Sequence, residues 1–210
     1  MGMRWRLATW ICVLASTAYG RDTSSGSEPD WLIVPGQRAG ALHRTSSEVQ
    51  LAQAYGRDAV QPLRVELGEG VTAPGTVLFA TDSLRRLEVL WHDTVARERP
   101  TRLVLRGSES RWQLPANISL GVGLRELERR NGRRFTLAGF GWDYGGVITD
   151  WEGGALAAQL PGVRLYLDPA TAQYQTAAYR EVLGDRDYSS GTPAMQALNP
   201  RVYQIYIDFE

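Results

Sequence analysis

Two stretches of this chain share one pattern of apolar residues, and this internal repeat restricts the possible fold more than any other feature of the sequence. Residues 42–56 and 118–132 each run from an aliphatic residue to a glycine. At the same offset in the sequence, the alternating apolar positions of residues 87–91 coincide with those of residues 163–167. Self-similarity at a fixed spacing is typical of duplicated structural units. We therefore expect a duplicated unit whose two copies bury their apolar sides together.

Each predicted unit consists of a short helix followed by antiparallel strands. In the first unit, Thr45 and Glu48 have the spacing of a capping box, and Gly56 would end the helix. In the second unit, the helix is expected to end at Asn131-Gly132. Helices this short need a sheet to pack on, because a short isolated helix is only marginally stable in water. Runs of strands with few helices favour an α+β fold over a parallel α/β fold.

The strands are expected where short apolar segments lie between turn residues, at 76–79, 87–91, 102–106, 144–151, 155–157, 163–167 and 202–209. A helical insertion precedes the last strand: one helix follows Asp168-Pro169 and runs to Gly184, and a shorter one ends at Asn199. The last strand alternates, with Tyr203, Ile205, Ile207 and Phe209 on its apolar side. The two units are expected at residues 31–107 and 108–210, as one compact domain.

The N-terminus has the layout of a secretory signal peptide. A positively charged start precedes an apolar run from Leu7 to Ala18, and small residues follow at a plausible cleavage position. The run is too short to span a bilayer comfortably, so a retained membrane anchor is the less favoured alternative. We expect residues 1–20 to be cleaved off, residues 21–30 to form a flexible linker, and the mature protein to be periplasmic or secreted without a membrane span.

Composition excludes several classes of function. Cleavage would remove Cys12, the only cysteine, so thiol catalysis, cysteine-based zinc sites and disulfides are excluded. The 23 basic residues, all arginine, balance 23 acidic residues, which gives no support to nucleic acid as a partner. No H-E-x-x-H, G-x-S-x-G or P-loop motif occurs, and we expect no cofactor and no metal.

The stretch GFGWDYGGVITDWEGG, residues 139–154, is the most unusual segment of the sequence. Its six glycines permit left-handed backbone conformations, and Gly145-Gly146 suggests a hairpin turn or a bulge. On one interpretation the segment is a turn whose aromatic residues fill the core. On the other it is a platform for a glycan or peptide ligand, because exposed aromatic rings beside carboxylates suit such ligands. The ligand-binding residues would then be Trp142, Asp143, Tyr144, Asp150, Trp151 and Glu152.

The carboxylates of this segment allow two further hypotheses. Asp143 and Glu152 could meet across a hairpin and act as the carboxylate pair of a small glycan-directed hydrolase. Asp143, Asp150 and Glu152 could supply oxygen ligands to calcium, although their spacing does not match an EF-hand. The enzyme hypothesis stands as the alternative to a binding function.

A dense arginine cluster lies in and directly after the second predicted helix. Glu126 and Arg130 stand at i and i+4, so an ion-paired face in contact with solvent explains part of the cluster. The functional interpretation is a site for an acidic partner or a phosphate, formed by Arg129, Arg130, Arg133 and Arg134 with Arg125 nearby.

The segments 124–132, 135–144 and 151–154 resemble a family of uncharacterised secreted bacterial proteins that carry a GFGWDY motif. This resemblance covers most of the mature chain and implies a location and a fold but no activity. More loosely, the tandem unit is similar to the duplicated modules of the β-lactamase inhibitor protein and of small outer-membrane assembly lipoproteins, which are mostly protein-binding modules. This chain lacks the lipidated cysteine of those lipoproteins. We expect a non-enzymatic binding module whose partner is another envelope protein or a glycan or peptide ligand.

Overall fold

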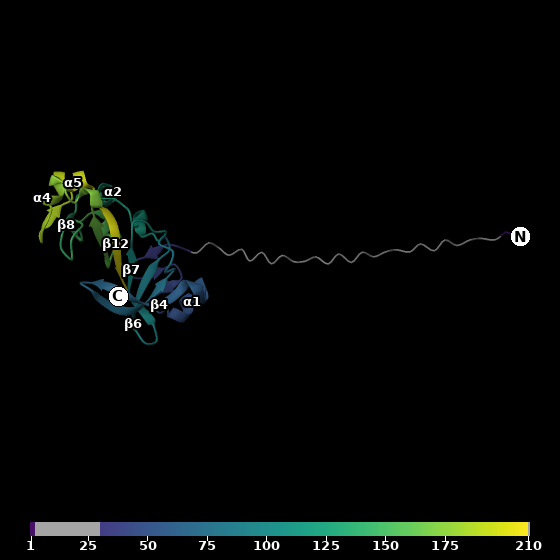
Figure 1. Ribbon diagram of the computed structural model, residues 1–210. Coiled ribbons are helices and arrows are strands. Elements are labelled where there is room, and N and C mark those ends of the chain that lie inside the picture. The colour runs from purple at the N-terminus through teal and green to yellow at the C-terminus, as the bar shows by residue number, and fades with distance from the viewer. Residues whose placement is uncertain (3–29, 210) are drawn as a thin grey trace.

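The computed structural model describes residues 1–2 and 30–209. Residues 3–20 of the predicted signal peptide and residues 21–29 of the predicted linker lie outside these residues. The described chain is an α+β fold in which strands predominate, with five α-helices and twelve strands in three antiparallel sheets, and this confirms the predicted fold class. Figure 1 shows the largest sheet running through the whole body, with α1 at one end and α2, α4 and α5 at the other.

The largest sheet has six strands in the order β10-β12-β7-β6-β5-β4. In chain order these strands are β4 (Val60–Gly68), β5 (Val71–Leu78), β6 (Leu87–Asp93), β7 (Glu98–Arg106), β10 (Val163–Asp168) and β12 (Arg201–Asp208). Strands β4 to β7 form a meander, in which each strand pairs with the next. The C-terminal strand β12 then lies between β7 and β10, so the two halves of the chain share one sheet.

Two small sheets complete the strands. One contains β1 (Ile33–Val34), β2 (Arg38–Ala39) and β3 (Leu42–His43). The other has the order β11-β8-β9 and contains β8 (Thr136–Ala138), β9 (Ile148–Asp150) and β11 (Asp187–Ser189). The predicted strand at 144–151 is therefore shorter than expected, because its first residues belong to the turn between β8 and β9.

The helices are short, as expected. They are α1 (Glu48–Tyr55), α2 (Leu124–Asn131), α3 (Ala155–Gln159), α4 (Ala177–Glu181) and α5 (Pro193–Leu198), with 3-10 turns at Arg57–Ala59, Pro115–Asn117 and Thr171–Gln173. The predicted end of α2 is confirmed: Gly132 adopts the left-handed conformation, with a φ of 76°, and donates its amide hydrogen to the carbonyl of Glu128. The helical insertion before the last strand is present as the third 3-10 turn, α4 and α5, with β11 between the last two.

The main core lies on the helix-covered face of the large sheet. Leu103 and Leu105 of β7 contribute to it together with Leu124 and Leu127 of α2, and all four are at most 1% exposed. Trp112 is fully buried in the same cluster and donates its indole hydrogen to the carbonyl of Arg85 at 2.8 Å. This cluster contains residues from both halves of the chain. Their burial holds the two halves together, as disulfides do in a cysteine-rich fold.

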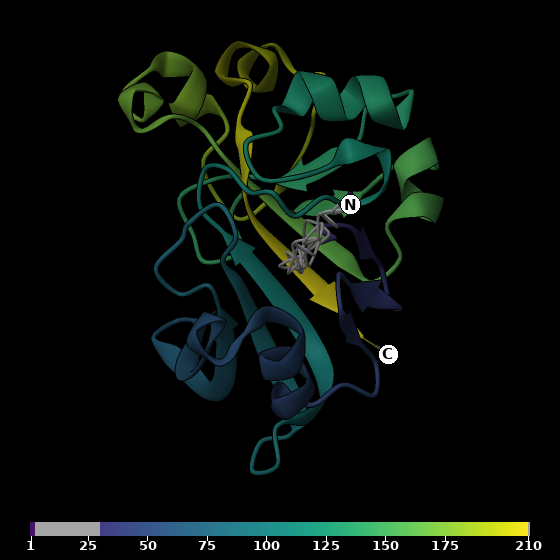
Figure 2. The same ribbon diagram turned by 90° about the vertical axis from the view of Figure 1, so that its right-hand side faces the viewer.

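The opposite face of the sheet carries a second, much smaller cluster. Its buried members are Val65, Val104, Tyr166 and Tyr206, and Val147 from the loop after β8 packs against it. None of the described helices contributes a residue to this cluster. In Figure 2, turned by 90° from Figure 1, α1, drawn in blue, lies in front of the strands, and the later helices lie around their upper ends. The helices of the described chain thus leave one face of the sheet uncovered.

The spacing that suggested a repeat recurs in the structure. α1 and α2 have eight residues each, and their first residues, Glu48 and Leu124, are 76 positions apart, as are Val60 and Thr136 at the beginnings of β4 and β8. The strands that follow these helices nevertheless belong to different sheets: β4 and β5 form the edge of the large sheet, whereas β8 and β9 form a small sheet with β11. The duplication itself stays a prediction.

The structure corrects two details of the predicted helices. α1 is capped by Ser47 with a capping box to Gln50, not by Thr45. Leu51 is its one buried residue, whereas Val49 is 64% exposed. The single helix expected after Asp168 is instead a 3-10 turn and the five-residue α4. A helix of one or two turns contains too few apolar residues for their spacing in the sequence to locate its ends.

Two predicted strands also need correction. Residues 155–157, expected as a strand, begin α3, and Leu156 of α3 and its C-cap residue Leu160 are both buried in the core. In β12 the alternation breaks at a bulge, because Leu167 pairs with Val202 and Tyr166 with Gln204. The bulge buries Val202 and leaves Tyr203 39% exposed, although Tyr203 was expected on the apolar side.

Candidate functional site

The 139–154 segment forms the loop and second strand of the β8–β9 hairpin, so the six residues expected to form one ligand platform separate into two groups. Trp142, Asp143 and Tyr144 lie in the turn between the strands. Asp150, Trp151 and Glu152 lie where β9 ends, opposite the start of β8, as the pairing of Thr136 with Asp150 shows. The structure brings the members of each group together but places the two groups at opposite ends of the hairpin.

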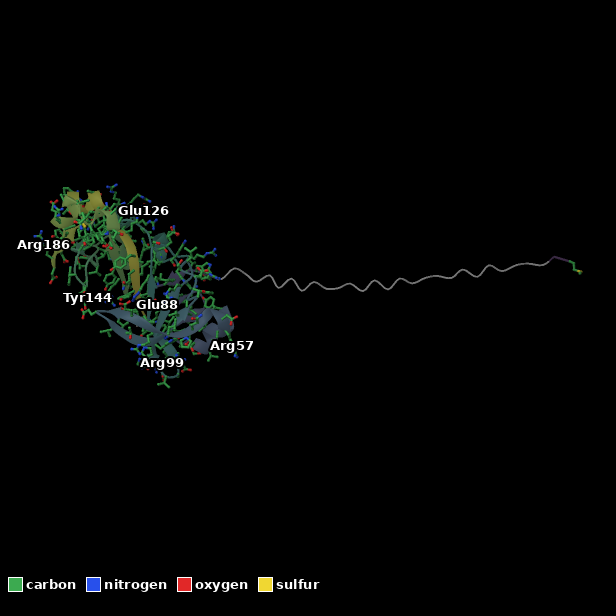
Figure 3. The ribbon with its side chains drawn as sticks, in the orientation of Figure 1. Arg57, Glu88, Arg99, Glu126, Tyr144 and Arg186 are labelled. Carbon is green, nitrogen blue, oxygen red and sulfur yellow. The ribbon has the colours of Figure 1, made fainter. Side chains whose placement is uncertain are left out.

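The turn group is held by contacts within the fold. The Trp142 indole donates to the carbonyl of Gly139 at 2.9 Å and meets the Tyr144 ring edge-on, with 5.5 Å between ring centroids. Below the turn, Gly146 is buried with a φ of 73°, and its carbonyl accepts the amide hydrogen of Leu167 in β10 at 2.9 Å. Figure 3 shows Tyr144 on the side of the molecule that faces the β4–β5 hairpin. Tyr144 is 52% exposed and therefore available for contact.

The second group has structural partners. The Trp151 ring packs against Phe135 at 5.3 Å, and the Trp151 carbonyl accepts a hydrogen bond from the buried Asn131 side chain. Asp150 accepts the amide hydrogen of Glu152 at 2.6 Å, and Glu152 accepts the Thr136 hydroxyl at 2.7 Å. These contacts fix the turn after β9, so they are explained without a ligand.

This separation bears on both carboxylate hypotheses. Asp143 and Glu152 lie at the two ends of the hairpin, and no hydrogen bond joins their side chains among the described residues. Among all the described residues, no group of three histidine, cysteine, aspartate or glutamate side chains is arranged to hold a metal ion. A carboxylate pair of the glycosidase kind must face one reacting bond from two sides, and this geometry does not favour it.

The arginine cluster lines an open hollow beside α2. Its walls are Arg125, Glu128, Arg129, Gly132, Arg133 and Arg134. Arg130 is not among them, because it pairs with Glu126 at 2.5 Å, as its i, i+4 spacing predicted, and donates to the carbonyl of Asn117. Arg129 also pairs with Glu126, and Arg133 donates to the carbonyl of Glu152 at 2.5 Å. Most of the cluster thus has partners within the fold, and we do not base a function on it.

A cleft that no sequence pattern predicted lies on the uncovered face of the large sheet. Three arginines and four tyrosines line it: Arg102, Arg106, Arg164, Tyr144, Tyr166, Tyr203 and Tyr206. Residues Glu66, Leu67, Gly68, Glu69 and Val71, at the tip of the β4–β5 hairpin, form one wall, and Asp143 with Tyr144 forms the other; Gln204 completes the floor. We call this hollow, which has a volume of about 440 Å³, the tyrosine–arginine cleft.

Pairing within the sheet explains how these residues gather. Tyr206 of β12 lies directly between Val104 of β7 and Arg164 of β10, and two residues further along β12 Asp208 lies opposite Arg102. Side chains two residues apart on a strand share a face, so the outward positions of three neighbouring strands form one surface. The cleft is therefore built on neighbouring, hydrogen-bonded strands of the largest sheet.

Electrostatic contacts hold the arginines around the Tyr206 ring. The guanidinium carbons of Arg102, Arg106 and Arg164 lie 5.3, 6.0 and 5.3 Å from its centroid, which is the range of cation–π attraction. Asp208 pairs with Arg102 at 2.5 Å and with Arg164 at 3.4 Å. Contacts within the protein thereby orient Arg102 and Arg164 without a ligand.

The inner side of the cleft is tied to the hairpin wall. Arg106 donates to the carbonyl of Glu66 at 2.5 Å, which fixes the tip of the β4–β5 hairpin over the sheet. Behind it lies Glu88, which is 6% exposed and is paired with Arg86 at 2.9 Å and with Arg106 at 3.7 Å. Burial raises the pKa of Tyr166, which meets the Tyr206 ring edge-on at 5.4 Å. The tyrosine rings are thus partly desolvated in the isolated chain.

A second aromatic hollow adjoins the cleft, around the half-buried Asp168 at the end of β10. Tyr174 donates its hydroxyl to the Asp168 carboxylate. Desolvation raises the pKa of Asp168, and the hydrogen bond from Tyr174 opposes that rise. No ion pair of Asp168 is found among the described residues.

Replacing Asp168 with asparagine is expected to change the pH dependence of stability. A carboxyl whose pKa is raised by folding stabilises the fold most below its unfolded pKa of 3.8, and this stabilisation is lost as pH rises through the raised value. An amide oxygen can also accept the Tyr174 hydrogen bond, so the variant loses the charge and keeps this contact. Urea unfolding from pH 4 to 7 should show the Asp168→Asn protein gaining stability relative to the wild type as pH rises. A difference that stays constant over this range would contradict the expectation.

Comparisons of this chain with protein-family models, with curated proteins and with solved structures find no match. The resemblances noted from the sequence therefore stay predictions, and a function can be inferred only from the geometry and chemistry of the site. None of the helices in the described part of the chain is long and apolar enough to cross a membrane.

Proposed function

We propose that this protein is a periplasmic or secreted binding module, without enzymatic activity, that holds a loop of a partner protein in the tyrosine–arginine cleft. The single observation that carries the proposal is the gathering of three arginines and four tyrosines on the one sheet face that the described helices leave uncovered. Tyrosine and arginine are enriched among residues that dominate binding energy at protein interfaces.

The chemistry of the cleft suits a peptide segment. Tyrosine rings offer large, stiff contact areas, and each guanidinium has five N–H donors. Arg102 and Arg164 each donate one N–H group to Asp208 in the described chain, and their remaining N–H groups are suited to carbonyl or carboxylate oxygens of a ligand. The lining also carries the carboxylates of Glu66, Glu69 and Asp143. A loop that presents polar groups between apolar residues would suit the guanidinium groups, these carboxylates and the rings.

The size of the cleft indicates that its rim must take part. A stable interface contains about 20–30 residues on each partner, which is more than the fourteen residues that line the cleft. Apolar and aromatic side chains stand exposed at the rim: Val71 is 54% exposed, and Tyr144 and Tyr203 are 52% and 39% exposed. A partner seated in the cleft would cover these side chains as well.

Capture from a cell-envelope extract tests the proposal. Immobilised protein covering residues 21–210 is compared with a Tyr144→Ala, Tyr203→Ala double variant and with a Trp142→Ala variant. A Val49→Ala, Val95→Ala double variant serves as the matched control, because both valines are strongly exposed and lie outside the cleft. We expect the wild type and the control to retain the same partner and the Tyr144→Ala, Tyr203→Ala variant to lose it. Trp142→Ala, which removes the ring that Tyr144 contacts at the rim, should retain less of the partner. A partner retained equally by all four proteins would refute the assignment of the cleft.

A further inference from the structure

The hollow around Asp168 is a box of aromatic rings. Its sides are Trp142 from the β8–β9 loop, Tyr174 after the 3-10 turn, Tyr179 in α4 and Tyr203 in β12, with Asp168 and Asp143 as its charged members. The Tyr174 and Tyr179 rings stack at 4.9 Å between centroids, and Phe140 stacks behind Tyr179 at 6.0 Å. We call this hollow, which has a volume of about 410 Å³, the aspartate–aromatic box.

The charged side chains that line the box are all negative. Its lining, within the described part of the chain, contains two carboxylates and no arginine. Desolvation and, next, the negative charge of Asp168 raise the pKa of Tyr179, and the same two causes raise the pKa of Tyr203. The charge of Asp168 therefore acts on Tyr179 in α4 and on Tyr203 in β12. The face of an aromatic ring is itself electronegative.

We propose that the aspartate–aromatic box binds an organic cation, either a quaternary ammonium group or the cationic end of an arginine or lysine side chain. Ammonium and guanidinium groups are attracted to the faces of tryptophan and tyrosine within about 6 Å of the ring centre. Tyr179 lies between Tyr174 and Phe140 in the stack, so this attraction falls to Trp142, Tyr174 and Tyr203. The carboxylate of Asp168 supplies the opposite charge, and the stacked rings exclude part of the water that would screen it. Cation binding here does not require a protein partner in the neighbouring cleft.

Titration with small probes, followed by NMR of the labelled protein, tests this inference. The probes are choline, N-acetyl-arginine amide, N-acetyl-lysine amide and 3,3-dimethylbutanol, the uncharged isostere of choline. The reporter is the indole N–H of Trp142, which is held by the Gly139 carbonyl at 2.9 Å inside the box. We expect at least one cation to shift this signal in a saturable way and the uncharged isostere to leave it unchanged. The cation that binds most tightly identifies the source, as a free quaternary ammonium compound or a cationic side chain.

Asp168→Asn is the decisive variant, because it removes the charge and keeps the shape. It is expected to weaken cation binding about tenfold, as the loss of one close charge pair near the surface would do. Asp93→Asn is its control, since Asp93 lies in the β6–β7 turn, where its side chain caps the amides of Val95 and Ala96. Equal shifts from choline and 3,3-dimethylbutanol, unchanged affinity in Asp168→Asn, or no cation-dependent shift of Trp142 would each overturn the proposal.

Discussion

Replacing Gly146 with alanine is expected to destabilise the protein by about 4 kcal/mol or more, which is a large part of the stability of a single domain. An alanine Cβ at this position would lie 1.9 Å from the carbonyl oxygen of Leu167, much closer than any real contact. The backbone at Gly146 also has a φ of 73°, which side chains other than glycine adopt only at a cost. Relief of the clash would require the β8–β9 loop to leave β10, and the loop carries Trp142 and Tyr144.

Gly132→Ala is the matched control for this prediction. Gly132 has nearly the same φ, 76°, but an added Cβ would meet nothing within 4 Å. This variant should lose only about 1 kcal/mol, the cost of the left-handed conformation alone. Denaturant unfolding of both proteins measures the difference. Equal losses of stability in the two variants would show that the β8–β9 loop is not packed against β10 as described.

Replacing Tyr206 with alanine is expected to weaken binding of the captured partner by roughly 30-fold or more, which corresponds to about 2 kcal/mol. Its ring forms the centre of the cleft floor, and three guanidinium groups are arranged around it. Without the ring, the arginines lose the surface that orients them, and the cleft loses the apolar centre of its floor. Calorimetry or surface binding with the purified partner gives the change in affinity.

Two further variants separate binding from folding in this prediction. Tyr206→Phe keeps the ring and removes only the hydroxyl, which lies 3.5 Å from Arg106, so its affinity should stay within a few fold of the wild type. Arg164→Ala changes a half-exposed side chain and should weaken binding while leaving thermal stability nearly unchanged. If the Arg164→Ala and Tyr206→Ala variants both bound the partner with wild-type affinity, the cleft would not be the binding site.

The elements that could be predicted from the sequence are those whose signals are local. α2 ends at Asn131 because Gly132 takes the left-handed conformation there, and this requirement is visible in the residue itself. The edge strand β4 was not predicted, because only Val65 of its nine residues is buried and its polar and apolar residues do not alternate cleanly. Residues 155–157 were assigned to a strand because three apolar residues cannot distinguish the two periodicities; only the packing of Leu156 and Leu160 decides for a helix.

The site depended on information that local patterns do not contain. The 139–154 segment was singled out for its composition, and its turn does supply Asp143 and Tyr144 to the cleft and Trp142 to the box. Most of the remaining residues come from strands far apart along the chain, and no local pattern specifies the register between β7 and β12. A usable signal was present, however. The outward positions of expected strands carry Arg102, Arg106, Arg164 and Tyr206, and arginine together with tyrosine is enriched at protein interfaces.

Site-specific photo-crosslinking in living cells tests the central claim, that the uncovered sheet face is the binding surface, most directly. A benzophenone side chain is introduced singly at Tyr144 and Tyr203 on the rim of the cleft, and singly at Val49 and Val95 outside it. We expect the same crosslinked adduct from Tyr144 and Tyr203 on the rim and no such adduct from Val49 and Val95. An adduct formed from Val49 or Val95 and absent at both rim positions would contradict this expectation, because the partner would then bind a different surface.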